Sequence, residues 1–182
     1  PAYATTTLVP LNAIWTYATD CDPSGDWITD AYDDSDWPSG QGVLGYETAP
    51  LPEPIRTVLS PENRITRCFR TTFFFDGVPS DEARLRLRVL IDDGAVFYLN
   101  GVEVHRVNMP SGPITASTAA AVGVGDATFA AAVALPIESL VQGENLLAVA
   151  VHQSSTQSSD LVMGLELTIQ EVTEAGMAGT PF

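Results

Sequence analysis

Residues 84–106 read RLRLRVLIDDGAVFYLNGVEVHR, and this stretch decides the fold class. Its first six residues alternate arginine with leucine or valine, which is the period-two pattern of a strand with one buried face. A turn at residues 92–94 leads into an apolar run that ends at Asn100-Gly101. That dipeptide is typical of a tight hairpin, because both central residues of the turn take positive φ. We therefore predict a strand, a turn and a β-hairpin.

The rest of the chain repeats this strand pattern. Residues 65–75 and 161–170 alternate in character, and residues 146–151 form a continuous apolar run typical of a central strand. Helical signal is scarce, and only residues 136–141 suggest a short turn. Strands separated by Gly-, Pro- and Asp-containing loops predict an all-β, antiparallel β-sandwich. We expect one domain over residues 1–172 and a tail or linker over 173–182.

Composition limits the partners of this domain. Of 182 residues, 45% are hydrophobic, enough for a core, and the net charge is −15. All eight basic residues are arginine, which argues against binding to nucleic acid or to an anionic membrane surface. Metal ions, neutral sugars and cationic partners remain compatible. The chain begins at Pro1 without Met, so we expect it to be part of a longer protein.

The two cysteines, Cys21 and Cys68, match no zinc-binding spacing. A disulfide between them is the preferred interpretation, and two unpaired buried thiols are the alternative. A bridge closing so long a loop would stabilise the fold by roughly 4 kcal/mol and would indicate a secreted, extracellular protein.

A series of short motifs, taken in order, resembles a known family. The motifs are Trp15-Thr16-Tyr17, residues 32–37 and 42–46, Cys68-Phe69-Arg70, residues 92–104, Arg106, Asn108-Met109-Pro110, Gly143-Glu144-Asn145, Val151-His152-Gln153 and Ser159-Asp160-Leu161. The series resembles the galactose-binding-like jelly-roll modules appended to secreted bacterial hydrolases. That resemblance covers about residues 13–170 and implies a jelly-roll topology. Such modules bind glycans in some proteins and brace an attached catalytic domain in others.

Residues 20–36 form an acidic loop, with seven aspartates and no cation. Asp20, Asp22 and Asp26 could surround one calcium ion, which takes six to eight oxygen ligands at flexible spacing. Similar jelly rolls hold a structural calcium where the first loop meets the last strand, and this resemblance adds Asp160 as a fourth ligand. The alternative is a solvated acidic face. Asp92-Asp93-Gly94, followed by a short strand and Asn-Gly, also resembles a motif of adhesin-type sugar-binding domains, which implies a calcium ion that binds sugar hydroxyls. The alternative for this pair is a turn whose carboxylates cap backbone N–H groups.

Sugar binding needs an aromatic platform and planar polar side chains. We predict Trp27, in the acidic loop, as an exposed platform, and Tyr46 as a second aromatic contact. Asn108, His152 and Gln153 are the polar candidates, although each has a structural explanation; His152, for example, could be a buried imidazole bonded to a neighbouring loop.

Three functions follow. The favoured one is a non-catalytic carbohydrate-binding module, stabilised by calcium, that carries an attached catalytic domain to a polysaccharide or oligosaccharide. The second is a structural or protein-interaction module without a glycan site. The third is a small hydrolase with an acidic pair, which is disfavoured because no catalytic motif is present.

Overall fold

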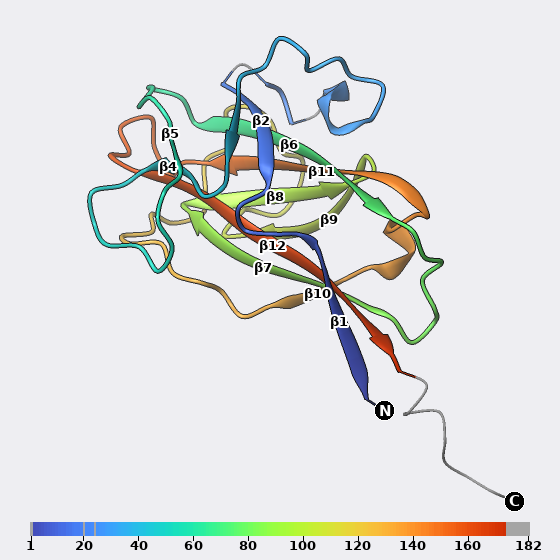
Figure 1. Cartoon of the computed structure of the whole chain (residues 1–182). Coiled ribbons are helices and arrows are strands. Elements are labelled where there is room, and N and C mark those ends of the chain that lie inside the picture. The colour runs from blue at the N-terminus through green and yellow to red at the C-terminus, as the bar shows by residue number, and fades with distance from the viewer. Residues whose placement is uncertain (1, 20, 24, 174–182) are drawn as a thin grey trace, which may run out of the picture.

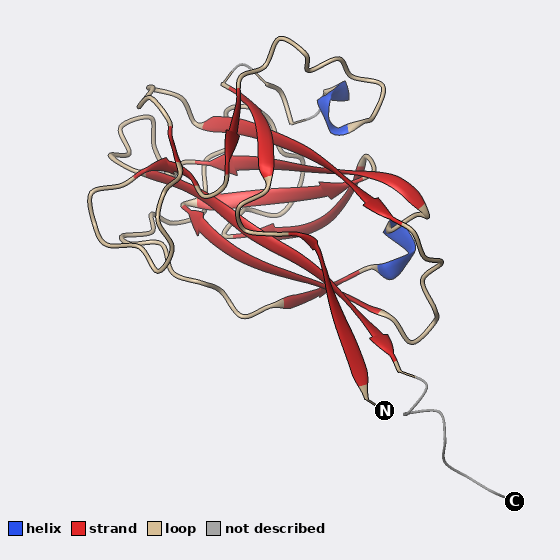
Figure 2. Ribbon diagram, viewed as in Figure 1, coloured by secondary structure: helices blue, strands red, loops and turns tan. Residues whose placement is uncertain are grey.

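The computed structural model describes residues 2–19, 21–23 and 25–173 and consists of two facing β-sheets (Figures 1 and 2). The first sheet contains β10 (Val133–Leu135), β7 (Arg84–Asp92), β12 (Leu161–Val172), β4 (Leu44–Tyr46) and β5 (Thr57–Val58), with β1 (Tyr3–Val9) also paired to β12. The second contains β3 (Ser39–Gln41), β2 (Ile14–Ala18), β6 (Thr66–Phe75), β11 (Gly143–His152), β8 (Gly94–Leu99) and β9 (Val102–Val107). The predicted all-β sandwich is confirmed. All strand pairs are antiparallel except β4 with β5.

The deciding stretch forms β7, β8 and β9. The apolar members of the RLRLRVL pattern are buried, at 0%, 1% and 4% exposure for Leu85, Leu87 and Val89. Asn100 and Gly101 have φ values of 53° and 82°, as the hairpin turn requires. Notably, β7 and β8 lie in different sheets, so the turn at residues 92–94 carries the chain from one layer to the other.

The core lies between the sheets, where the inward faces of both interdigitate. Strand β11 is central, between β6 and β8, as the apolar run predicts. Strand β12 differs from its prediction of a single buried face. Val162, on its second face, is fully buried with Val43, Leu90 and Ala127, because loops cover that side of the sheet.

The acidic loop covers the outer face of the second sheet. Trp27 packs in a cluster with Cys68, Tyr98 and Ala148 of that sheet. Cys21 and Cys68 are joined by a disulfide, with their Cα atoms 6.2 Å apart. The loop therefore has a small core of its own, separate from the main one.

Helical structure among the described residues is limited to two single 3₁₀ turns, η1 (Asp26–Ile28) and η2 (Ile137–Ser139). Neither has the length or the apolar content to cross a membrane. The second falls within the predicted turn over residues 136–141. Strand β12 ends at Val172, and residues 174–182 of the predicted tail lie outside the described residues.

Candidate metal and ligand sites

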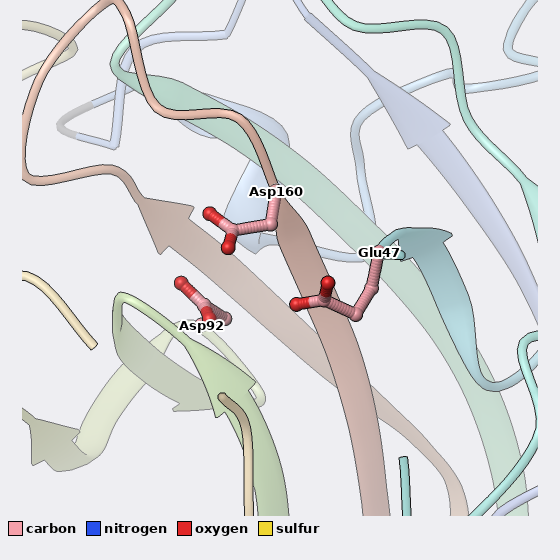
Figure 3. Close-up of side chains that lie close together, drawn as sticks. All are labelled: Glu47, Asp92 and Asp160. Carbon is pink, nitrogen blue, oxygen red and sulfur yellow. The ribbon is translucent and has the colours of Figure 1, made fainter. Parts of the chain in front are cut away.

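Three carboxylates converge at one end of the first sheet (Figure 3). Glu47 directly follows β4, Asp92 is the last residue of β7, and Asp160 directly precedes β12. Strand β12 pairs with both other strands, and its register sets Leu161 opposite Tyr46 and Val162 opposite Asp92. One oxygen from each acid lies within 4.8 Å of the others. We call these three residues the acid cluster.

Asp92 is the most unusual member of the acid cluster. Its side chain is 0% exposed, and neither carboxylate oxygen has a hydrogen-bond partner. Burial raises the pKa of Asp92 to about 8, and the negative charge of Asp160 adds to this effect. Burial also raises the pKa of Asp160, with a contribution from the charge of Glu47. The arrangement is therefore unfavourable for three bare negative charges.

Asp93 has a different role from its neighbour. Its carboxylate accepts hydrogen bonds from the backbone N–H groups of Val124 and Ser154. It thereby ties two separate loops to the end of β7, as the capping interpretation of the Asp92-Asp93 pair predicts for one of its members. The Asp92 carboxylate caps no backbone N–H group and faces Glu47 and Asp160 instead (Figure 3).

A groove of about 410 Å³ lies where β2 ends. Two half-buried aromatic side chains, Tyr17 and Trp37, line it. Its charged lining residues are Asp36, Glu62 and Arg67. We call this the aromatic groove. It combines apolar ring surface with both acidic and basic hydrogen-bonding groups.

The guanidinium group of Arg67 is fixed in this groove. Arg67 is only 3% exposed and donates a hydrogen bond to the carbonyl of Ser60. The Glu62 carboxylate lies 3.9 Å from it, and the Tyr46 ring lies beneath it, 5.9 Å from the ring centre. The groove is thus connected to Tyr46, which immediately precedes Glu47 of the acid cluster.

The predicted aromatic contacts are engaged within the protein. Trp27 is 2% exposed, and its indole N–H donates to the carbonyl of Asp22 at 2.8 Å. The prediction of an exposed platform at Trp27 is therefore wrong, because the acidic loop folds this ring onto the sheet. Tyr46 is half-buried, beneath Arg67, and its hydroxyl lies 3.4 Å from the amide nitrogen of Gln153.

The predicted polar contacts are also internal. His152 and Gln153 are 0% and 2% exposed. Asn108, with φ of 51°, uses its amide to bond the carbonyls of Asp93 and Val122. These three side chains hold loops together, and the structure does not bring them to a common surface with Trp27.

The imidazole of His152 is neutral in this setting. Its Nδ1–H donates to the carbonyl of Thr118 at 2.8 Å, and the Thr66 hydroxyl lies 2.9 Å away, itself donating to the carbonyl of Ala116. Nε2 is buried without a partner. Burial lowers the pKa of His152 to about 4.

The structure does not bring the predicted metal ligands together in one site. Asp20 lies outside the described residues, and Asp22 and Asp26 are exposed in the acidic loop. Asp160 joins Glu47, which was not predicted, and Asp92, which was considered only as one of a separate Asp92-Asp93 calcium pair. The three acids share only a position at a strand boundary, which by itself is no signal of a metal site. Only the strand order reveals that these boundaries meet.

The cluster fits a calcium ion in its chemistry. Its donors are all carboxylate oxygens, the type that calcium prefers, whereas zinc favours nitrogen and sulfur. Ligands on opposite sides of a calcium ion lie about 4.6–5.2 Å apart, twice the usual 2.3–2.6 Å bond. One oxygen from each of the three acids lies within 4.8 Å of the others, so no separation in the acid cluster exceeds the span that one calcium ion can bridge.

Comparison with known proteins identifies the architecture. No protein-family model and no curated protein sequence matches the chain. A calcium-binding mutant of Bacteroides uniformis beta-glucuronidase 2 matches with a TM-score of 0.52 and 18% identity, over 92% of this chain and 18% of that chain. A beta-glycosidase from Bacteroides vulgatus gives 0.52 and 14%, over 91% and 20%. A glycosyl hydrolase family 2 member from Bacteroides cellulosilyticus gives 0.53 and 16%, over 91% and 20%.

These similarities define the class of protein by its fold alone. The chain is a β-sandwich of the kind that occurs as one part of family 2 glycosidases. It spans about a fifth of the length of these structures.

Proposed function

We propose that this chain is a non-catalytic, galactose-binding-like jelly-roll module that binds carbohydrate and belongs to a larger secreted carbohydrate-active protein. Calcium stabilisation is part of the proposal. The observation that carries the binding role is the aromatic groove, which unites Tyr17 and Trp37 with Asp36, Glu62 and Arg67. We place the sugar there rather than at the buried Trp27.

The groove has the chemistry that a sugar requires. Aromatic rings pack against the C–H faces of pyranose rings, while carboxylates and guanidinium groups bond to hydroxyls. Asp36 and Glu62 are the exposed charged groups of the groove. The buried Arg67, held by the carbonyl of Ser60 and the ring of Tyr46, lies 3.9 Å from Glu62 and helps to orient that carboxylate, which reduces the conformational entropy lost when Glu62 binds a ligand. A neutral saccharide also avoids repulsion from a chain with a net charge of −15.

Two further observations support the setting. The fold occurs within larger glycosidases, of which it makes up about a fifth, and this favours an attached catalytic domain as partner. The disulfide between Cys21 and Cys68 favours an oxidising compartment, and therefore secretion.

The geometry of the acid cluster favours a non-catalytic role for it. Glycoside hydrolysis needs two carboxylates on opposite sides of an accessible sugar, about 5–9.5 Å apart. Asp92 is fully buried, and one oxygen of each cluster acid lies within 4.8 Å of the others. No sugar ring fits between them.

The binding role is tested by titrating the 182-residue chain against a panel of soluble polysaccharides in calcium-containing buffer. We expect one glycan class to bind, and Trp37→Ala to weaken it on the order of tenfold, the effect of losing one stacking surface. Phe74→Ala is the matched control, because Phe74 is an aromatic that is 69% exposed on a different surface.

Trp37 also packs against Trp27 and Tyr32, so Glu62→Gln provides a second variant that leaves the aromatic packing intact. Loss of binding in both groove variants, with Phe74→Ala unchanged, supports the proposal. Failure of the wild-type chain to bind any member of the panel overturns it.

A second candidate function is a structural module that docks on a neighbouring domain. The outer face of β2 and β6 bears exposed apolar side chains at Ile14 and Phe74, which are 60% and 69% exposed, and Val141, two residues before β11, is 47% exposed. In that case Phe74→Ala becomes the informative variant. It would lower the melting temperature of the parent protein without affecting the melting temperature of the isolated chain.

A further inference from the structure

We propose that Glu47, Asp92 and Asp160 bind one calcium ion, which clamps the ends of β4, β7 and β12 together. The proposal replaces the ligand set predicted in the acidic loop. It rests on the calcium part of the proposed function and is independent of carbohydrate binding.

The unpartnered carboxylate of Asp92 is the first argument. A buried polar group without a hydrogen bond is costly, and a buried charge without a partner far more so. Asp92 is 0% exposed, both of its oxygens lack a partner, and the group faces Glu47 and Asp160 (Figure 3). A cation held among these oxygens satisfies all three acids at once.

The other two acids are already oriented by hydrogen bonds. Oε1 of Glu47 accepts the backbone N–H groups of Thr48 and Ala49, while Oε2 is buried and has no partner. Oδ1 of Asp160 accepts the hydroxyl of Ser158 at 3.1 Å. Each carboxylate is thus fixed through one oxygen. Such pre-orientation reduces the entropic cost of assembling a metal site.

The backbone next to the acid cluster is equally well fixed. The Gln153 amide nitrogen donates to the carbonyl of Asp160, and the Gln153 backbone N–H donates to the carbonyl of Ile65 at 2.7 Å. Asp93 anchors the loops at Val124 and Ser154. These hydrogen bonds fix the backbone next to the acid cluster without help from a metal ion.

The ligand chemistry selects calcium among common divalent cations. The three carboxylates supply at least three oxygens, and calcium, which takes six to eight oxygen ligands with flexible geometry, accepts backbone carbonyls and water in its remaining positions. Magnesium demands a smaller octahedron and retains water, whereas Asp92 lies fully buried. Zinc prefers histidine and cysteine, and neither belongs to the group.

The test uses the 182-residue chain, stripped with EDTA and titrated with calcium chloride by calorimetry, with a parallel thermal melt. We expect one calcium per chain and a melting temperature several degrees higher at saturation. Asp92→Asn should weaken calcium at least a hundredfold. In EDTA at pH 8 this variant should melt no lower than wild type, because it removes the buried charge that the metal would neutralise.

The matched control is Asp22→Asn with Asp26→Asn, two predicted ligands in the acidic loop. We expect this control to bind calcium as wild type does. Asp160→Asn is a second cluster variant, for use if Asp92→Asn does not fold, and it should show the same loss of affinity. A magnesium titration of wild type should give at least tenfold weaker binding.

The failures are distinguishable. If the wild-type chain takes up no calcium, both this inference and the calcium part of the proposed function are overturned. If calcium binds but is lost in the acidic-loop control and retained in Asp92→Asn, only the ligand assignment is overturned. Equal affinity for magnesium would overturn the choice of ion.

Discussion

The acidic loop and the acid cluster present the same chemical group in opposite settings. The loop places seven aspartates within residues 20–36. The cluster takes three acids from positions 47, 92 and 160, separated by 45 and 68 residues. Sequence density points to the loop as the metal site, whereas, among the residues that the structure describes, three acids converge in the cluster around Asp92, whose two carboxylate oxygens are buried without a partner.

The difference lies in what each carboxylate contacts. In the loop, Asp34 pairs with the buried Arg70 at 3.0 Å and accepts the hydroxyl of Thr16 at 2.7 Å. Asp33 accepts the backbone N–H of Ser35, and Asp26 and Asp30 are exposed to water. Water and local donors satisfy these charges. The charges of these four loop residues are therefore accommodated without a metal ion.

Removing the disulfide that holds the acidic loop should have the largest effect on the free energy of unfolding. The bridge between Cys21 and Cys68 attaches the acidic loop to β6 across 47 residues of sequence. We expect Cys21→Ser with Cys68→Ser to lower the free energy of unfolding by about 4 kcal/mol, the chain-entropy value for a loop of this length. Urea denaturation of both forms measures it. A loss below 1 kcal/mol would mean that the loop is held by its packing alone.

Truncating Arg70 should have the next largest effect. Its guanidinium is 4% exposed and donates to the carbonyls of Trp27, Thr29 and Tyr32, besides pairing with Asp34. We expect Arg70→Met to cost about 3 kcal/mol, because several buried carbonyls lose their donor. The control is Arg86→Met, because Arg86 of β7 is more accessible to solvent than Arg70. Equal losses in the two variants would contradict a special role for Arg70.

The third prediction concerns the pH dependence of the unfolding free energy, to which the buried His152 contributes. His152 precedes Gln153, whose amide donates to the carbonyl of Asp160 in the acid cluster. The pKa of His152 is lowered to about 4 from its ordinary 6.5, so the unfolded chain takes up the proton first as the pH falls. This contribution to stability is complete above about pH 6.5 and is lost as the pH falls toward 4. Between pH 7 and pH 5 it amounts to about 2 kcal/mol.

His152→Gln isolates this contribution, because other titrating groups are common to both proteins. The difference in unfolding free energy between pH 7 and pH 5 should be about 2 kcal/mol smaller in the variant than in wild type. Parallel stability profiles for the two proteins over this range would show that His152 titrates with the same pKa in the folded and unfolded states, and would contradict a lowered pKa in the fold.

The fold was largely predictable, because its signals are local. The alternation in residues 84–90, the Asn100-Gly101 turn and the apolar run at 146–151 each act within a few residues, and each gives the expected strand or turn. The disulfide predicted from the cysteines is present. The transfer of the chain between sheets at residues 92–94 has no comparable signal, since an Asp-Asp-Gly turn serves equally within one sheet.

The sites were less predictable, because they depend on which strand ends meet. Asp160 was predicted as a ligand, but Glu47 was not, since a single acid after a strand carries no pattern. Trp27 illustrates the opposite error. An aromatic in a polar loop suggests exposure, yet apolar positions on the outer face of the sheet, at Val96, Ala148 and Ala150, bury it.

The smallest effect is expected from Asp26→Asn with Asp30→Asn in the acidic loop. This double variant makes the same chemical change in the exposed loop that Asp92→Asn makes in the buried acid cluster. Both side chains are exposed, so replacing carboxylate with amide changes only screened repulsion, and the unfolding free energy should move by less than about 0.5 kcal/mol. The same chemical change at Asp92, measured in EDTA at pH 8, should raise the melting temperature by more than the loop double variant does. Raising the salt concentration separates the two cases further, because mobile ions screen the exposed loop acids but do not reach a carboxylate that is 0% exposed. If the loop variant instead proves the more stabilising of the two at high salt, the repulsion that matters lies in the loop, and the buried charge of Asp92 is already compensated in the metal-free protein.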